Sequence, residues 1–121
     1  MTQPEFLTAF VRAWLTDDAS ERRRCLEQCW ADDGVFIQRN SVAEGRDALA
    51  ETIAQGIRNW PAGATIPTSD VEEHHNWLRY RWKIVGGDGA VYAEGLHVAE
   101  RGDDGRVRLM ITFNGPPPTL D

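Results

Sequence analysis

The sequence predicts one α+β domain in which helices cover one side of a strongly curved antiparallel sheet. Apolar residues recur at helical spacing through residues 6–57. Polar and apolar residues then alternate through residues 75–113, and turns rich in glycine and aspartate separate the alternating stretches. The chain has 121 residues, of which 41% are hydrophobic, which is enough apolar material for one core but not for two. Helices followed by a meander of strands are typical of the α+β class.

The first helix is expected to begin at a capping box formed by Thr2 and Glu5. Pro4 would then lie in the first turn, where a residue without an N–H is tolerated. Apolar residues at helical spacing would form the buried stripe: Phe6, Leu7, Phe10, Val11, Trp14 and Leu15.

The second helix is expected to begin at another capping box, Asp18 with Glu21, and to end at the turn 32–34. Its apolar face would consist of Cys25, Leu26, Cys29 and Trp30. Cysteines four residues apart on one helix are poorly placed for an unstrained disulfide, so we expect two reduced thiols in the core. The short apolar stretch 35–38 predicts an extended segment.

The third helix is expected after Gly45 and to end at the stretch 59–61, which contains a proline. Its buried stripe would be Leu49, Ile53 and Ile57. A loop over 61–67 would then lead into an extended stretch from about residue 68.

Three strands joined by tight turns are expected in the second half. The strands would cover 75–85, 90–100 and 106–113, and the turns 86–89 and 102–105. Alternation in the first strand would turn one set of residues toward the helices: His74, Asn76, Leu78, Tyr80 and Trp82. In the second strand, small residues share a face with a histidine and would leave space above the sheet: Ala93, Gly95, His97 and Ala99.

Composition and charge argue against several classes of partner. The net charge is -6 and no basic face stands out, which disfavours nucleic acids and anionic membranes. No stretch has the length and hydropathy of a membrane span, and the N-terminus lacks the features of a signal peptide. The cytoplasm is therefore the expected location.

The outward face of the 75–85 strand carries Trp77 together with Arg79 and Arg81. Tryptophan and arginine are both enriched at protein interfaces, so this face is expected to form a homodimer contact. The alternative is a tryptophan that is merely exposed beside charged residues.

Five short motifs follow one another along the chain: 30–34 (WADDG), 44–49 (EGRDAL), 78–82 (LRYRW), 93–97 (AEGLH) and 104–113 (DGRV…F). Their order resembles the nuclear transport factor 2-like superfamily and, within it, the SnoaL-like branch, related to polyketide cyclases and ketosteroid isomerases. The resemblance implies a single SnoaL-like domain over 1–121 with a Pro-rich tail at 115–121. It also implies a cystatin-like α+β roll with a cone-shaped pocket, and a homodimer through the outer face of the sheet.

The resemblance does not imply one activity, because the superfamily includes isomerases, polyketide cyclases, epoxide hydrolases, dehydratases and non-catalytic domains. Ketosteroid isomerases carry an aspartate as the general base at the position that aligns with Gln38, and an amide cannot take a proton. They also use a tyrosine of the first helix, which this chain lacks. Steroid-type isomerisation is therefore not expected, although Gln38 could orient a ligand through its amide.

His97 is the candidate acid/base, because SnoaL-like cyclases often carry an acid/base aspartate at this position of the strand. A pocket histidine can exchange a proton near neutral pH. Tyr80 and Asn76 would stabilise charge on a ligand oxygen, and the alternative is a histidine hydrogen-bonded within the core. The remaining ligand-binding candidates are Trp14, Trp30, Phe36, Gln38, His74, Leu78, Trp82 and Phe113.

Two functions remain open on these residues. The first is a cofactor-independent isomerase, cyclase or dehydratase that moves protons on a small, mostly apolar carbonyl compound. The second is a non-catalytic module that binds a hydrophobic molecule or another protein. No cofactor is expected, and no metal, because His74 and His75 would face opposite sides of a strand.

Overall fold

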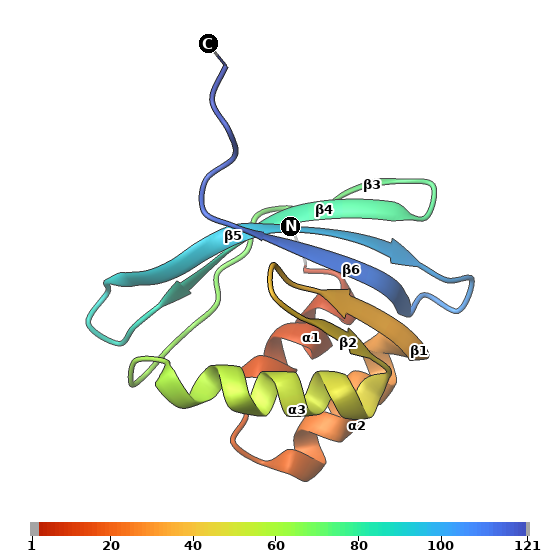
Figure 1. The fold of residues 1–121 in the computed structure, drawn as a ribbon, viewed down its shortest axis with the longest axis horizontal. Coiled ribbons are helices and arrows are strands. Elements are labelled where there is room, and N and C mark those ends of the chain that lie inside the picture. Colours follow the sequence, from red (N-terminus) through yellow and green to blue (C-terminus); the bar gives the residue numbers. More distant parts are fainter. Residues whose placement is uncertain (1–2, 121) are drawn as a thin grey trace.

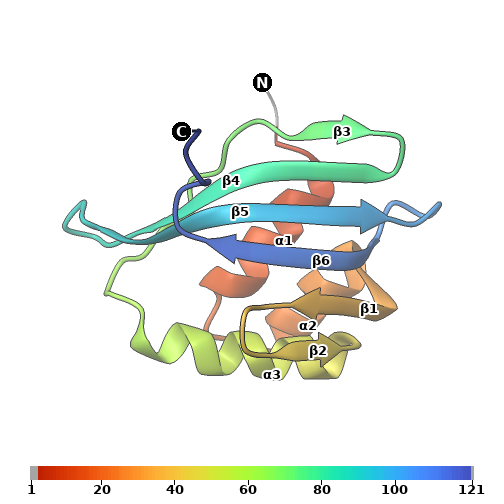
Figure 2. The ribbon, with the colours of Figure 1, turned by 45° about the horizontal axis from the view of Figure 1, so that its top comes forward.

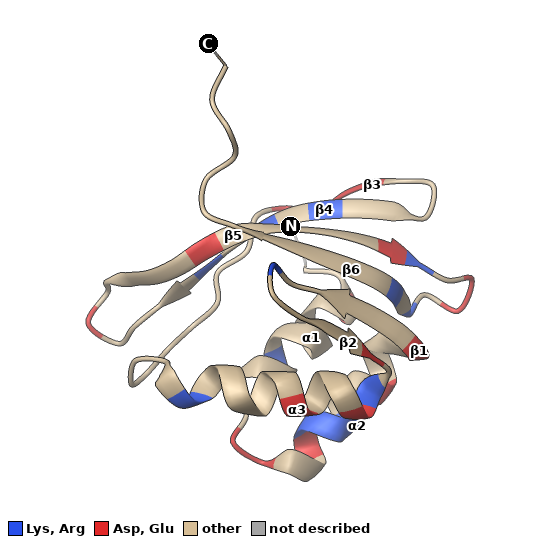
Figure 3. Ribbon diagram, in the orientation of Figure 1, with Lys and Arg blue, Asp and Glu red and all other residues tan. Residues whose placement is uncertain are grey.

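A computed structural model describes residues 3–120, which form a layer of three helices against one face of a six-stranded sheet (Figures 1 and 2). The helices are α1 (Glu5–Leu15), α2 (Ala19–Cys29) and α3 (Arg46–Gly56), and the short 3₁₀ helix η1 (Ile57–Asn59) follows α3 directly. No helix among the described residues is long and apolar enough to cross a membrane. Basic and acidic residues occur along both the helices and the strands (Figure 3).

The sheet is open, with the strand order β2-β1-β6-β5-β4-β3. Its strands are β1 (Trp30–Ile37), β2 (Val42–Glu44), β3 (Glu72–His74), β4 (Trp77–Val85), β5 (Val91–Arg101) and β6 (Val107–Asn114). β1 pairs with β6 in parallel and every other pair is antiparallel. The sheet is therefore mixed, whereas the sequence predicted an antiparallel sheet. No short hairpin joins β1 to β6, and the direction of β1 is therefore free of the constraint that a tight turn imposes.

A side chain caps the second helix, whereas the N-cap residue of the first helix makes no side-chain hydrogen bond. Asp18 caps α2 as expected, because its carboxylate accepts hydrogen bonds from the backbone N–H of Ser20 and Glu21. Thr2, the expected cap of α1, lies outside the described residues. Pro4 is the N-cap of α1 rather than a residue of its first turn, and its carbonyl accepts from Leu7 and Thr8.

The second helix ends earlier than the sequence suggested. α2 stops at Cys29, and Trp30 already has the extended angles φ −122° and ψ 131°. The stretch 32–34 therefore lies inside β1 and does not form a helix-ending turn. Gly34 is required there by close packing, since a Cβ at this position would come within 2.5 Å of Nε1 of Trp30.

The strand expected over 75–85 begins two residues later, at Trp77, because a hairpin turn precedes it. β3 turns into β4 at His75 and Asn76, and His75 adopts a positive φ of 58°. Residue 74 therefore pairs with Trp77 in the neighbouring strand and does not continue the alternation of β4. The expectation that His74 and Asn76 face the helices is wrong for this reason. The alternation from Leu78 onward is confirmed by burial.

A β-bulge changes which side chains of β6 face the helices. Glu100 pairs with Leu109 while its neighbour Arg101 pairs with Val107, so Arg108 is an extra residue in β6. The bulge reverses the alternation, which turns Met110 and Thr112 inward. The expectation that Phe113 lines the pocket is therefore wrong, because this side chain is 54% exposed on the outer face.

The hydrophobic core lies between the helices and the concave face of the sheet. Its largest fully buried side chains are Trp30, Phe10, Phe36, Leu7, Leu26, Leu49, Ile53 and Met110. Cys25 and Cys29 are both buried free thiols, as the sequence predicted. Burial raises the pKa of Cys29 to about 12, so this thiol stays protonated and packs as a small apolar group.

Candidate functional site

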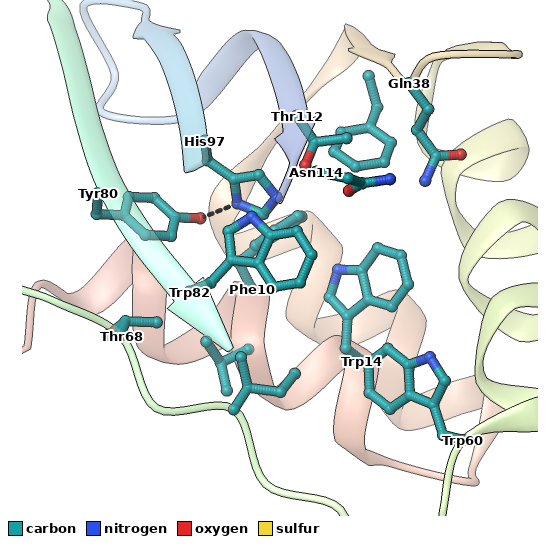
Figure 4. Close-up of a pocket in the computed structure, with 13 residues that line it drawn as sticks. Phe10, Trp14, Gln38, Trp60, Thr68, Tyr80, Trp82, His97, Thr112 and Asn114 are labelled. Carbon is teal, nitrogen blue, oxygen red and sulfur yellow. Dashed lines mark hydrogen bonds between the residues drawn. The ribbon is translucent and has the colours of Figure 1, made fainter. Parts of the chain in front are cut away.

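A half-open pocket lies where the concave face of the sheet meets α1 and the segment that follows α3 (Figure 4). Its cavity volume is about 80 Å³. Its lining comes from α1, β1 and the residue after it, the segment 60–68, β4, β5 and β6: Phe10, Val11, Trp14, Phe36, Gln38, Trp60, Ile66, Thr68, Tyr80, Trp82, His97, Thr112 and Asn114.

Aromatic rings form most of the pocket wall. Trp14 of α1 stacks on Trp60 with ring centroids 5.6 Å apart and planes 5° from parallel. Phe10 lies at the inner end, where it meets Trp14 edge-on and His97 edge-on. Flat aromatic walls of this kind favour planar apolar ligands, which stack on the rings or meet their edges.

The polar centre of the pocket is a hydrogen bond between Tyr80 and His97 (Figure 4). The two residues are direct cross-strand partners on β4 and β5, and Tyr80 Oη lies 2.7 Å from His97 Nδ1. The neighbouring pair on the same face is Trp82 with Gly95, and the glycine leaves room for the indole ring. The space above Gly95, which the sequence predicted would be left for a ligand, is therefore occupied by the indole of Trp82.

Burial makes both members of the pair neutral at pH 7. Desolvation lowers the pKa of His97 to about 3, because no opposite charge compensates for the loss of water. Desolvation also raises the pKa of Tyr80 well above its ordinary value of 10.0. The pocket therefore contains an uncharged imidazole and an uncharged phenol rather than an ion pair.

Two polar atoms of lining residues have no hydrogen-bond partner among the described residues. They are the indole nitrogen of Trp82 and the hydroxyl of Thr112, and both are buried. The side-chain amide of Gln38 accepts a hydrogen bond from Ser41 through its oxygen, at 3.0 Å. Figure 4 shows the nitrogen of this amide on the side of Asn114. Among the described residues, none that lines the pocket is an aspartate, glutamate, lysine or arginine.

The structure brings together six of the residues that the sequence singled out. These are Trp14, Phe36, Gln38, Tyr80, Trp82 and His97, and all of them line the pocket. Two others, Trp30 and Leu78, are buried in the core and do not line it.

Three further candidates lie away from the pocket. His74 is exposed on β3, Asn76 is in the β3–β4 turn and Phe113 is on the outer face. Asn76 instead holds the end of β5, since its carbonyl accepts from the backbone N–H of Arg101. A role for these three side chains in the pocket would require a different register of β3, β4 and β6.

Sequence reasoning missed several lining residues. Phe10 and Val11 share a helical face with Trp14, so the spacing of α1 could have identified them. Thr112 and Asn114 could not be identified, because the bulge that turns them inward has no clear sequence signal. Trp60, Ile66 and Thr68 were missed because the path of the chain after α3 brings them to the pocket, and no periodic pattern predicts this path.

The described residues contain no group of three histidine, cysteine, aspartate or glutamate side chains that could hold a metal ion. The chemistry available to the pocket residues is therefore that of neutral hydrogen-bond donors and acceptors, aromatic surfaces and one imidazole–phenol pair.

Solved structures share this fold. A candidate isomerase of the SnoaL-like family from Agrobacterium tumefaciens is 23% identical and aligns with a TM-score of 0.82 over 92% of this chain and 95% of its own. A candidate polyketide cyclase from Sinorhizobium meliloti is 14% identical, with a TM-score of 0.70 over 92% of this chain and 95% of its own.

A protein from Catenulispora acidiphila with a ketosteroid isomerase-like fold, solved in complex with trimethylamine, is 13% identical, with a TM-score of 0.71 over 93% of this chain and 86% of its own. By sequence, no family model and no curated protein matches the chain. The chain thus has the nuclear transport factor 2-like fold in the form that SnoaL-like proteins share.

Proposed function

We propose that this protein binds a small, uncharged, largely aromatic compound in the pocket of α1, β4, β5 and β6. The observation that carries the proposal is the absence of charge among the described residues of the lining, combined with the neutral Tyr80–His97 pair at its centre. An ionised ligand would lose its water there without gaining an opposite charge, which is strongly unfavourable. An uncharged planar ligand loses little on entry and gains contact with the aromatic walls.

The size of the pocket limits how much of a ring compound it can enclose. The enclosed space of about 80 Å³ is smaller than the apolar cavity of about 150 Å³ that is known to hold benzene. A ligand of one or two rings would therefore extend partly through the open side of the pocket. No cofactor is needed for binding of this kind.

Ligand titrations followed by ¹H–¹⁵N NMR test the proposal. Toluene, acetophenone and benzoate have similar shapes and differ in polarity and charge. We expect the two uncharged compounds to shift the resonances of pocket residues and benzoate to bind at least ten-fold more weakly, because its carboxylate would be desolvated. Tighter binding of benzoate than of acetophenone would contradict the proposal.

The Tyr80–His97 hydrogen bond favours a second candidate function, proton transfer on a carbonyl compound. A neutral imidazole accepts a proton through its unprotonated nitrogen, so this candidate requires the other tautomer, in which Nδ1–H of His97 donates to Tyr80 and Nε2 faces the ligand. Thr112 or Gln38 could hydrogen-bond the oxygen that becomes negative. Isomerases, cyclases and dehydratases without cofactors share this step. The low pKa of His97 makes it a weak base, so the step requires the ligand to stabilise the imidazolium ion that forms.

Deuterium exchange into a ketone tests this candidate without knowledge of the natural substrate. If His97 moves protons, the protein in D₂O should speed exchange of the methyl protons of acetophenone, and His97→Gln should abolish the effect. His74→Gln is the matched control because His74 is exposed on β3. Equal exchange rates with and without wild-type protein, at a concentration where acetophenone binds, would leave ligand binding as the function.

We also propose that the outer face of the sheet forms a homodimer through Trp77, Arg79 and Arg81. Trp77 is 45% exposed on this face beside the two arginines, and tryptophan and arginine are both enriched at protein interfaces. Native mass measurement should give twice the 13.6 kDa of one chain, and Trp77→Glu should give the monomer. A wild-type monomer at tens of micromolar would contradict the dimer. The cytoplasmic location expected from the sequence stays a prediction.

A further inference from the structure

Two polar groups of the pocket share one arrangement, in which the hydroxyl of a neighbouring residue is hydrogen-bonded to one atom of each group. Tyr80 Oη lies 2.7 Å from Nδ1 of His97. Ser41 Oγ lies 3.0 Å from Oε1 of Gln38. In both cases the atom that is left for a ligand is the other nitrogen of the group, Nε2.

We infer that His97 and Gln38 present N–H donors to the ligand, so the pocket selects an uncharged compound with hydrogen-bond-accepting oxygen, such as a ketone, lactone or quinone. Tyr80 and Ser41 are the positioning residues that fix this polarity. The inference rests on the proposed binding function and adds the chemical class of the ligand to it.

The acceptor of the Tyr80 hydroxyl hydrogen decides which ring nitrogen of His97 carries the proton. A neutral imidazole has one N–H donor and one acceptor nitrogen. Among residues 3–120, His97 Nδ1 is the one hydrogen-bond partner recorded for Tyr80 Oη. If Nδ1 carried the proton, the buried phenol hydrogen would have no acceptor, which is costly in the interior. Tyr80 therefore donates to Nδ1, and the proton of the imidazole is on Nε2.

The orientation of the Gln38 side-chain amide follows from the turn between β1 and β2. The backbone N–H of Gln38 donates to the carbonyl of Ser41 at 2.9 Å, which closes the loop between β1 and β2. This turn brings the Ser41 hydroxyl to the amide oxygen of Gln38. Figure 4 shows the amide nitrogen directed to the side of Asn114, where the pocket lies.

The remaining polar groups of the lining are consistent with an accepting ligand. The indole N–H of Trp82 can only donate, and it has no partner within residues 3–120. Thr112 and Asn114 can donate or accept, so they do not oppose the polarity that His97 and Gln38 set.

The tautomer of His97 is a direct test that needs no ligand. Long-range ¹H–¹⁵N NMR spectra distinguish a protonated from an unprotonated imidazole nitrogen. We expect Nε2 of His97 to be protonated and Nδ1 unprotonated at pH 7, and Tyr80→Phe to populate both tautomers. Protonation at Nδ1 in the wild-type protein would overturn the assignment for His97.

Ligand preference tests the polarity of the whole pocket. Indane, 1-indanone and indole have nearly the same size, and they offer no hydrogen bond, an accepting oxygen and a donating N–H respectively. We expect 1-indanone to bind about five-fold more tightly than indane, as one or two hydrogen bonds would give, and indole no more tightly than indane. Ser41→Ala should reduce the preference for 1-indanone about three-fold without changing the affinity for indane, and Ser41→Thr should restore it. Because Ser41 is exposed, this variant does not put folding at risk.

The outcomes separate the two proposals. Binding of indane with a preference for indole over 1-indanone, or with no preference, would overturn the donor polarity and leave the binding function intact. Failure of all three compounds to bind would overturn the binding function, and with it the selection of an accepting ligand.

Discussion

The two faces of the β4–β5 hairpin place ionisable groups in opposite surroundings although their residues alternate along the same strands. On the outer face Arg79 pairs with Glu72 at 2.6 Å, and both side chains are exposed. On the inner face Tyr80, the next residue, pairs with His97 at 2.7 Å, and both are buried. The outer pair is an ion pair in water and the inner pair is a neutral hydrogen bond in an apolar pocket.

This difference shows that solvent access, rather than residue type, sets the chemistry available on each face. Water screens the outer charges, so each ion pair there contributes little to stability. On the inner face desolvation removes the charge of His97, and one hydrogen bond has no water to replace it. The inner face is therefore where single substitutions should have large effects, and the outer face is where they should not.

The largest effect is expected at Gly95, on the inner face. A Cβ there would come within 2.5 Å of Cζ2 of Trp82 and would also collide with the carbonyl oxygen of Phe113. Gly95→Ala should therefore lower the free energy of unfolding by about 3 kcal/mol or more, as overpacking against backbone does. Urea denaturation measures this change.

Gly102→Ala is the matched control for that measurement. The nearest atoms to its new Cβ would belong to two side chains and not to the backbone, Arg108 at 3.1 Å and Asp104 at 3.4 Å. We expect a loss within about 1 kcal/mol. An equally small loss for Gly95→Ala would mean that Trp82 can move aside and that the inner face is not closely packed.

The next effect is a pH dependence that His97 causes. In the unfolded chain this imidazole takes up a proton near its ordinary pKa of 6.5, whereas in the folded protein it stays neutral until about pH 3. The unfolded state therefore binds more protons in this window, so stability is lost as the pH falls from 6.5 toward 3. The slope should approach about 1.4 kcal/mol per pH unit.

His97→Gln should remove this contribution. Between pH 7 and pH 4 the wild-type protein should lose about 3 kcal/mol more stability than the variant. Urea denaturation at a series of pH values measures the difference, and His74→Gln on exposed β3 is the control. Parallel curves for wild type and His97→Gln would show that the imidazole is hydrated in the folded state.

A smaller effect is expected when the hydroxyl of Tyr80 is removed. Tyr80→Phe leaves Nδ1 of His97 buried without its partner, which should cost about 1–3 kcal/mol. Tyr92→Phe, at an exposed position of β5, should change stability by less than about 0.5 kcal/mol. Thermal unfolding of the two variants side by side checks the contrast, and equal stabilities would mean that water replaces the lost hydroxyl.

The smallest effect is expected for the ion pair on the outer face. Arg79→Gln should change the free energy of unfolding by less than about 0.5 kcal/mol, because both partners are exposed. Unfolding measured at low protein concentration isolates this contribution from any association through the outer face. A loss above about 1 kcal/mol under those conditions would show that the pair is stronger than solvent exposure allows.

Local patterns were sufficient to predict much of the fold and part of the site. The period of the apolar residues identified all three helices, and Asp18 marked the start of α2. Alternation placed Tyr80 and Trp82 on one face of β4, and His97 beside small residues on β5. These predictions succeeded because they depend on neighbours within a few positions of the chain.

The misplaced residues depend on pairing between strands. His74 was assigned to the wrong face because the turn at His75 and Asn76 interrupts a sequence that alternates without a break. Phe113 was assigned to the pocket because the bulge at Arg108 reverses the parity of β6. A turn at a non-glycine residue and a bulge without a glycine leave little trace in the residues themselves.

The sequence by itself determined that this chain folds as helices on a curved sheet, and that a histidine lies above small residues on one face of a strand. Only the tertiary structure decided that Tyr80 meets His97, that Thr112 and Asn114 join them, and that the described lining carries no charge. The physical reason is that periodicity is a local property, whereas the neutrality of His97 comes from burial by segments distant in the chain, including α1 and β1.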